Sequence, residues 1–289
     1  MFLRIDYVLP LFMSVVGFTS QVIAAELPPF GYPKFETLSV HANSNNKDYE
    51  LYVQVPQSYA DSKTNYPLIL VNDSRFAFPV TTGAMALMGG AVVQEAVVVG
   101  ISYAKGEDRS ISRTRDYTPT YSPIEKSGYS SASRLASGHA KEYVDFIETQ
   151  VIPLVQQKYR IDTKKKVFVG HSFGGLLGAY ILFTKPELFT DYIIGSPSLW
   201  YDNRVMFSME KEYAKFHTQL PVNVSMFVGE LENDYYPMVK DLHDMEKQLR
   251  LRNYKGLNLK VEVLANENHH SVFPGLLSKG LVATIPLKK

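Results

Sequence analysis

Residues 167–180 constrain the fold of this chain more than any other stretch. They begin with the apolar run Val-Phe-Val, which is typical of a buried strand, and continue with Gly-His-Ser-Phe-Gly at 170–174. An apolar stretch of helical length follows. The five-residue motif fits Gly-x-Ser-x-Gly, and its place between a strand and a helix is that of a nucleophile elbow. Glycines let the strand and the helix pass close together at this sharp turn. The sequence therefore predicts that Ser172 lies exposed at the start of a helix.

Strands and helices alternate along most of the remaining chain. Short apolar or alternating runs predict strands at 67–71, 96–101, 191–195, 222–229 and 257–264. Helical signals predict helices at 81–93, 138–159 with a kink at Pro153, 203–217, 237–254 and from 271 onward. A turn sequence at 43–48 joins alternating runs at 35–41 and 49–55, which predicts a β-hairpin. This order predicts an α/β fold, in which a mostly parallel sheet with an antiparallel N-terminal hairpin is covered by helices on both faces.

The segment at 103–137 is the exception to this alternation. It is long, polar and rich in Ser, Tyr and Arg, with few helix or strand signals. A structureless segment of this length inside a compact domain is typically functional or mobile. We therefore expect an irregular segment that is either functional or mobile.

Composition narrows the class of protein. The chain has 289 residues, of which 45% are hydrophobic and 20% charged, and its net charge is +1. These values are those of a globular protein, and they argue against a nucleic-acid partner because no basic tract stands out. Cysteine is absent, which excludes a disulfide framework. One domain, at 25–289, accounts for the pattern.

The first 24 residues have the pattern of a secretory signal peptide. Arg4 precedes an apolar core at 7–18, a polar step at 19–21 and Val-Ile-Ala at 22–24. We expect cleavage near Ala25 and a periplasmic or secreted mature protein. The apolar core is short for a bilayer-spanning helix, so we expect no membrane span after cleavage.

A serine hydroxyl needs a base to take its proton and an acid to orient that base. In folds with a nucleophile elbow, the chain order is serine, acid, histidine. Of the seven histidines, two follow the last predicted strand, His269 and His270, in a loop at 265–274. A loop at that point reaches back over the strand ends to Ser172. Either histidine is therefore a candidate base.

Three acids follow the strand that ends at Gly229: Glu230, Glu232 and Asp234. Glu232 has the common Gly-x-x-acid spacing and is the predicted acid of the triad. Glu230 is alternatively a structural hydrogen-bond acceptor at the strand end. A serine–histidine dyad without a dedicated acid remains an alternative.

An oxyanion hole requires two N–H donors. The backbone amide of Phe173, next to the nucleophile, is the first. The second is expected from the loop after the strand at 67–71, at Ser74 or Arg75. We expect neither a metal nor an organic cofactor.

Several blocks of the chain resemble one branch of the α/β-hydrolases, which includes esterase D and the trilactone siderophore esterases. The blocks are Asn-Asp-Ser (72–74), Arg-Thr-Arg-Asp-Tyr-Thr-Pro (113–119), Gly-His-Ser-Phe-Gly-Gly (170–175), Ser-Pro-Ser-Leu-Trp (196–200), Val-Gly-Glu-Leu-Glu (228–232) and Glu-Asn-His-His-Ser-Val (267–272). They span almost the whole chain after the signal peptide, in the family's order. The resemblance implies that Ser172 is the nucleophile and His269, matching Glu-x-His-x-Ser-Val, the base. At Ser74 the chain departs from the family, which usually has glycine there.

The block at 113–119 and Trp200 carry the expectations about substrate binding. Two arginines followed by an acid suggest that either Arg113 or Arg115 pairs with Asp116 while the other faces the cleft and holds an acidic or carbonyl-rich group. A salt-bridged loop anchor is the alternative. Trp200 follows a strand end and is either a wall of the substrate pocket or a packing residue.

The sequence thus predicts a serine hydrolase that cleaves carboxylic esters through an acyl-enzyme, with a small-molecule ester as its partner. A trilactone siderophore esterase, a thioesterase or an acyltransferase would use the same residues. A binding protein with the hydrolase fold but no catalysis is the alternative from another class, and it predicts a broken triad.

Overall fold

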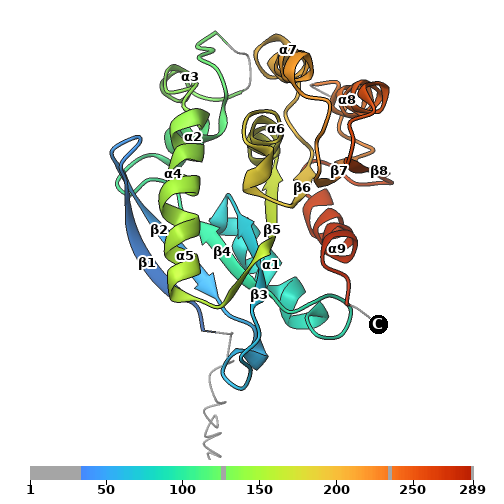
Figure 1. The fold of residues 1–289 in the computed structure, drawn as a ribbon. Coiled ribbons are helices and arrows are strands. Elements are labelled where there is room, and N and C mark those ends of the chain that lie inside the picture. The colour runs from blue at the N-terminus through green and yellow to red at the C-terminus, as the bar shows by residue number, and fades with distance from the viewer. Residues whose placement is uncertain (1–33, 125–127, 234–235, 288–289) are drawn as a thin grey trace, which may run out of the picture. The chain divides into compact units, whose positions relative to one another are not determined.

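An eight-stranded mixed sheet organises the computed structural model, which describes residues 34–124, 128–233 and 236–287 (Figure 1). The predicted signal peptide lies outside these residues. The strands are β1 (Glu36–Ala42), β2 (Lys47–Gln54), β3 (Tyr66–Val71), β4 (Val97–Ile101), β5 (Ile161–His171), β6 (Asp191–Gly195), β7 (Asn223–Gly229) and β8 (Asn258–Leu264). Each predicted strand is present, and their bounds differ from the predicted ones by a few residues at most, except that β5 begins six residues earlier.

The strands lie in the order β1-β2-β4-β3-β5-β6-β7-β8. β1 and β2 form the predicted antiparallel hairpin, β2 pairs antiparallel with β4, and the other neighbouring strands pair in parallel. The predicted α/β fold with an N-terminal hairpin is therefore confirmed. Because the strands from β5 to β8 are parallel neighbours, their carboxyl ends meet at one edge of the sheet.

Helices cover both faces of this sheet (Figure 1). They are α1 (Ser74–Met88), α2 (Arg109–Tyr117), α3 (Ser131–Leu135), α4 (Ala140–Phe146), α5 (Ile152–Lys158), α6 (Phe173–Thr184), α7 (Tyr201–Phe216), α8 (Met238–Arg252) and α9 (Val272–Thr284). Alternate residues of β5 enter separate cores, because Val167 and Val169 belong to the apolar cluster that includes residues of α1 and α9, whereas Phe168 belongs to the one that includes residues of α4, α6 and α8. No helix in the described part of the chain is long and apolar enough to cross a membrane.

Residues 103–137 are more regular than the sequence predicts, since they contain α2 and α3. Asp108 caps α2 by accepting hydrogen bonds from the amides of Ser110 and Ile111. The buried face of α2 is mostly polar and includes Arg115 and Asp116. A search for apolar residues at helical spacing misses such a helix, because ion pairs replace the apolar stripe.

Helix α1 begins earlier than predicted, at Ser74 instead of residue 81, directly at the end of β3. Asp73 makes this abrupt change of direction with a left-handed backbone (φ 54°, ψ 44°). The helix also tolerates Pro79 and Gly83 in its interior, because Ala77 and Phe78 are buried in the core. Tertiary packing therefore outweighs a weak helical propensity here.

The helical segment at 138–159 contains an irregularity at the predicted place. A π-helical turn, Ile147–Val151, joins α4 to α5, and Pro153 lies in the first turn of α5. The amide of Ile152 bonds to the Ile147 carbonyl in the π-helical pattern, so Pro153, which has no N–H, falls directly after the point where the regular α-helical hydrogen bonds are already interrupted.

Candidate active site

The turn between β5 and α6 has the geometry of a nucleophile elbow. Ser172, between the last residue of β5 and the first of α6, has φ 61° and ψ −118°. This region is disfavoured for any residue with a Cβ and costs about 1–3 kcal/mol. A Cβ on Gly170 would lie 2.1 Å from the Gly174 carbonyl oxygen, and one on Gly175 would lie 2.7 Å from that of Gly195. The glycines are therefore required by close contact between backbones.

Three hydrogen bonds fix the main chain of Ser172. Its amide donates to the Gly195 carbonyl (3.0 Å), and its carbonyl accepts from the amides of Leu176 (2.9 Å) and Ser198 (3.2 Å). The side chain of Ser172 lines a cavity beyond the carboxyl edge of the sheet. The fold therefore holds a strained residue rigidly, with its side chain at the cavity.

Glu232 and His269 form an ion pair at the same edge. The Oε2 atom of Glu232 lies 2.5 Å from His269 Nδ1. The Oε1 atom of Glu232 accepts hydrogen bonds from the Ser196 hydroxyl and the Gly229 amide, both at 2.7 Å. The Glu232 side chain is 2% exposed and that of His269 is 35% exposed. With its oxygens occupied in this way, the carboxylate holds the His269 ring in one orientation.

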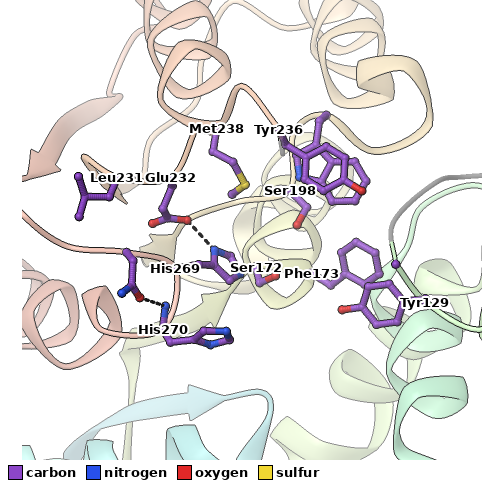
Figure 2. Close-up of a pocket in the computed structure, with 13 residues that line it drawn as sticks. Tyr129, Ser172, Phe173, Ser198, Leu231, Glu232, Tyr236, Met238, His269 and His270 are labelled. Atoms are coloured by element: carbon purple, nitrogen blue, oxygen red, sulfur yellow. Dashed lines mark hydrogen bonds and ion pairs between the residues drawn. The ribbon is translucent and has the colours of Figure 1, made fainter. Parts of the chain in front are cut away.

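Figure 2 shows the His269 ring between Glu232 and Ser172. The bond to Glu232 engages Nδ1, which leaves Nε2 as the nitrogen available to a proton from the serine side. The loop that carries His269 is attached to the turn after β7, because Leu231 N–H donates to the Glu267 carbonyl (3.0 Å). The acid and the histidine thus lie on two loops that are bonded to each other.

The other candidate acids and the second histidine have different surroundings. Glu230 accepts a hydrogen bond from the Asn266 amide (2.9 Å), as expected for a structural acceptor at the strand end. Asp234 lies outside the described residues. His270 also lines the cavity, and its amide donates to the Asn268 side chain (2.9 Å; Figure 2). Within the described ranges, no group of three or more His, Cys, Asp or Glu side chains is placed to hold a metal ion.

Sequence reasoning did not single out Ser196 as a partner of Glu232. Ser196 is fully buried, directly follows β6 and has a positive φ of 40°. Its position at the end of the strand next to β5 is the signal that would have identified it, since active sites in parallel sheets form at that edge.

The cavity has a volume of about 700 Å³ and a largely aromatic wall. Tyr129 stacks on Phe173 with ring centroids 4.9 Å apart (Figure 2). Trp200 stacks on Tyr236 with ring centroids 3.7 Å apart. Trp200 therefore lies at the cavity, as expected of a wall residue. The lining residues are Gly128, Tyr129, Ser172, Phe173, Ser198, Trp200, Leu231, Glu232, Tyr236, Met238, Asn268, His269 and His270. Flat rings of this kind favour planar or apolar groups of a ligand.

The two predicted oxyanion donors lie at helix starts. Phe173 is the first residue of α6 and lines the cavity, whereas Ser74 is the first residue of α1 and is not among the lining residues. The first amides of a helix have no acceptor within it, so both positions have a donor available. The left-handed backbone belongs to Asp73, so the geometry does not demand glycine at position 74.

Arg113 and Arg115 do not line the cavity; both are paired within the fold. Arg115 binds Asp116 through two nitrogens (2.9 and 3.1 Å), together with Glu107. Arg113 binds both oxygens of Asp73 (2.7 and 2.9 Å). The expectation that one of these arginines presents a free guanidinium to the cleft is therefore not met, and the anchoring alternative describes both.

Arg113 nevertheless reaches the elbow and the cavity wall. It donates to the Tyr129 hydroxyl (2.9 Å) and the His171 carbonyl (3.2 Å), and its guanidinium lies 5.4 Å from the centre of the Phe173 ring. Asp73, at the start of α1, also accepts from the Tyr103 hydroxyl (2.6 Å). This cluster joins the end of β3, helix α2 and the elbow.

Comparisons with known proteins support a hydrolase relationship. A profile of the family described as "Putative esterase" matches residues 42–275. The chain is 28% identical to the ferri-bacillibactin esterase BesA of Bacillus subtilis over 87% of this chain and 90% of that protein. It is 29% identical to a siderophore enterobactin esterase of Emericella nidulans over 67% of this chain and 64% of that protein.

Solved structures have the same fold. The BES protein of Bacillus cereus superimposes with a TM-score of 0.75 at 28% identity, covering 89% of this chain and 97% of that one. An IroE-like serine hydrolase of Shewanella oneidensis gives a TM-score of 0.76 at 24% identity, covering 86% and 79%. The second likeness bears on the fold alone.

Proposed function

The chain belongs to the "Putative esterase" family, and we propose that it is a serine esterase that hydrolyses carboxylic esters through an acyl-enzyme. The observation that carries this proposal is that Glu232, His269 and Ser172 line one cavity, with Glu232 bonded to His269 and Ser172 on a strained elbow. A strained serine beside a histidine that an acid orients is the arrangement used for acyl transfer.

In the proposed mechanism, His269 Nε2 takes the hydroxyl proton of Ser172 as the serine oxygen attacks the ester carbonyl. Glu232 stabilises the imidazolium that forms, because its buried carboxylate stays bonded to Nδ1. The amide of Phe173, which lines the cavity, stabilises the oxyanion, and the amide of Ser74 or Arg75, at the start of α1, is the proposed second donor. The imidazolium then protonates the leaving alcohol, and water, activated by the neutral His269, releases the acid and regenerates the serine.

Replacement of the nucleophile gives the largest expected effect. In Ser172→Ala, kcat for a short p-nitrophenyl ester is expected to fall on the order of a hundred-thousand-fold or more, since the variant has no nucleophilic oxygen. Labelling by a fluorophosphonate should disappear as well. Ser208→Ala, at an exposed position of α7, is the matched control and should keep full turnover. Unchanged hydrolysis in Ser172→Ala would falsify the proposal.

We further propose that the substrate is a siderophore ester with aromatic groups. The names of the relatives support this, and so does the aromatic wall of a cavity of about 700 Å³. The wild-type protein is expected to hydrolyse a trilactone siderophore, with or without iron, faster than an acetyl ester.

Trp200→Ala should lower kcat/KM for an aryl ester about tenfold more than for an acetyl ester, since one stacking face is lost. Equal losses for both esters would contradict the role of the wall.

The N-terminal pattern at 1–24 supports a third proposal, that the enzyme acts in the periplasm or outside the cell. N-terminal sequencing of the mature protein should then begin near Ala25. A chain that retains Met1 in the cytoplasmic fraction would contradict it.

A further inference from the structure

Ser198 is a second serine at the cavity, and the proposed reaction does not use it. It lies in the turn after β6, within the Ser-Pro-Ser-Leu-Trp block at 196–200, and it lines the cavity together with Ser172 and Trp200. Figure 2 shows its side chain between those of Tyr236 and Ser172. Ser198 is only 1% exposed, so the little surface that it keeps belongs to the cavity.

The main chain of Ser198 is bonded on both sides. Its amide donates to the Ser172 carbonyl (3.2 Å), and its carbonyl accepts from the Tyr201 amide (3.0 Å). A Cβ on Gly175 of α6 would lie 3.0 Å from the Pro197 Cα atom, so the turn packs directly on the helix that follows the nucleophile. The backbone of Ser198 is therefore fixed relative to Ser172 without help from the Ser198 side chain.

The hydroxyl of Ser198 has no hydrogen-bond partner among the residues that the structure describes. Ser196, two residues earlier and equally buried, provides the contrast, because its hydroxyl donates to Glu232 (2.7 Å). Alanine would be sufficient at position 198 for packing, since the fold does not use the oxygen. The hydroxyl therefore remains available to a group inside the cavity, and a few polar atoms of this kind in an apolar wall orient a ligand.

The place of this hydroxyl indicates which part of a substrate it meets. Ser172 is the proposed site of attack on the ester group, and Trp200, two residues after Ser198, belongs to the aromatic wall. A ligand that extends from Ser172 to the wall passes Ser198. The atoms beside Ser198 are then those that link the ester carbonyl to the group on the wall.

We propose that Ser198 is a specificity-determining residue, whose hydroxyl binds a hydrogen-bonding group in the acyl part of the substrate, between the ester carbonyl and the group that lies against Trp200. The inference rests on the proposed function. A hydroxyl both donates and accepts, so an amide in this link is bound through either its N–H or its carbonyl. A site built around such a bond discriminates against a substrate that lacks the group, because the hydroxyl then loses its partner.

Two p-nitrophenyl esters with acyl chains of equal length test this bond. The hippurate ester has an amide between its phenyl ring and the ester group, whereas the 4-phenylbutyrate ester has methylene groups in the same place. Ser198→Ala removes the hydroxyl, and Ser198→Cys fills the space with a weaker hydrogen-bonding group. Ser225→Ala, which changes a buried serine of β7 outside the cavity lining, is the matched control. For each protein, kcat/KM for both esters, the rate of fluorophosphonate labelling and Tm are measured.

The decisive quantity is the ratio of kcat/KM for the hippurate ester to kcat/KM for the phenylbutyrate ester. We expect this ratio to fall about 5- to 20-fold in Ser198→Ala. The intrinsic reactivities of the two esters cancel when the ratio is compared between variants. Ser198→Cys should lower the ratio about threefold or more although the space is filled. Both variants should keep the wild-type Tm, and Ser225→Ala should keep the wild-type ratio.

An unchanged ratio in Ser198→Ala would overturn the inference, whether the two rates stay the same or fall together. A lower Tm with an unchanged ratio would assign the hydroxyl to the fold instead. Wild-type protein that hydrolyses both esters while Ser198→Ala keeps the ratio refutes this inference and leaves the proposed function intact. Wild-type protein that neither hydrolyses esters nor becomes labelled refutes both.

Discussion

Two buried carboxylates lie beside the elbow, and each forms an ion pair with a basic side chain. In one pair the basic side chain keeps a nitrogen outside the pair, and in the other its donors are bonded within the fold. Glu232 pairs with His269 at 2.5 Å and Asp73 with Arg113 at 2.7 Å, and both carboxylate side chains are 2% exposed. The His269 side chain is 35% exposed and has one ring nitrogen beyond its bond to Glu232. Arg113 is 11% exposed, and its donors bind Asp73, Tyr129 and the His171 carbonyl.

The two ion pairs differ in whether one partner keeps an atom free to face the cavity, and this property distinguishes a reactive pair from a structural one. A charged side chain near a cavity acts on a substrate only if it keeps an unpaired atom directed at that cavity. His269 meets this condition, whereas Arg113 bonds within the fold and lies outside the lining. The first pair is therefore expected to govern turnover, and the second the stability of the elbow.

Glu232→Gln breaks the Glu232–His269 pair and is expected to cause a large loss of turnover. An amide does not stabilise the imidazolium and permits the wrong tautomer of His269, so kcat should fall about a thousand- to ten-thousand-fold. Ester hydrolysis measures this loss, and urea unfolding should show a small change in stability. Glu230→Gln is the matched control, since the Glu230 carboxylate accepts a hydrogen bond from the Asn266 amide and is not bonded to His269. Equal turnover in the two variants would indicate a serine–histidine dyad.

Arg113→Met breaks the structural pair. It leaves the Asp73 carboxylate buried without its partner, and the free energy of unfolding in urea is expected to fall by about 3–5 kcal/mol. The double variant Asp73→Asn with Arg113→Met should be more stable than the single one, because no buried charge is left unpaired. Arg109→Met, at an exposed position of the same helix, should change stability by less than about 0.5 kcal/mol. A stable Arg113→Met variant with altered KM alone would instead support substrate binding.

His171 contacts both pairs and gives the smallest of these effects, a dependence of stability on pH. Burial lowers its pKa in the folded protein, so below pH 6.5 the unfolded chain binds a proton that the folded one does not. Stability therefore falls on acidification, by about 1.4 kcal/mol between pH 7.5 and 5.5 from this group. His171→Phe should lose that portion of the dependence in urea unfolding at the two pH values. An identical dependence in both proteins would show that His171 does not remain neutral when buried.

The parts of the fold that the sequence predicts well are those with an apolar pattern. β3 and β4 are continuous apolar runs, and the elbow has its own motif, so their positions follow from hydrophobic burial and backbone sterics. Chain order narrowed the base to His269 or His270, the family resemblance selected His269, and the Gly-x-x-acid spacing selected Glu232. The structure brings Glu232 and His269 together. Their catalytic roles remain predictions that the variants above test.

The remaining features depend on contacts between distant residues. Helix α2 buries a polar face, so its pattern is indistinguishable from that of a surface loop. The partner of Arg113 is 40 residues away in the chain, at Asp73, and spacing within the arginine block does not identify it. Ser196 and His269 each bond to one oxygen of the Glu232 carboxylate, although the three residues come from different loops. Sequence periodicity carries no information on such pairings.

The attachment of the His269 loop to the turn after β7 has a consequence for engineering. Because β7 and β8 are adjacent and their turns are bonded, Glu232 and His269, the proposed acid and base, are expected to keep their mutual geometry when both turns are transplanted together. Tyr129, in contrast, lies in the segment between α2 and α3, which contributes neither of these two residues. Loop exchange in that segment therefore offers a route to new substrates that leaves the reaction chemistry in place.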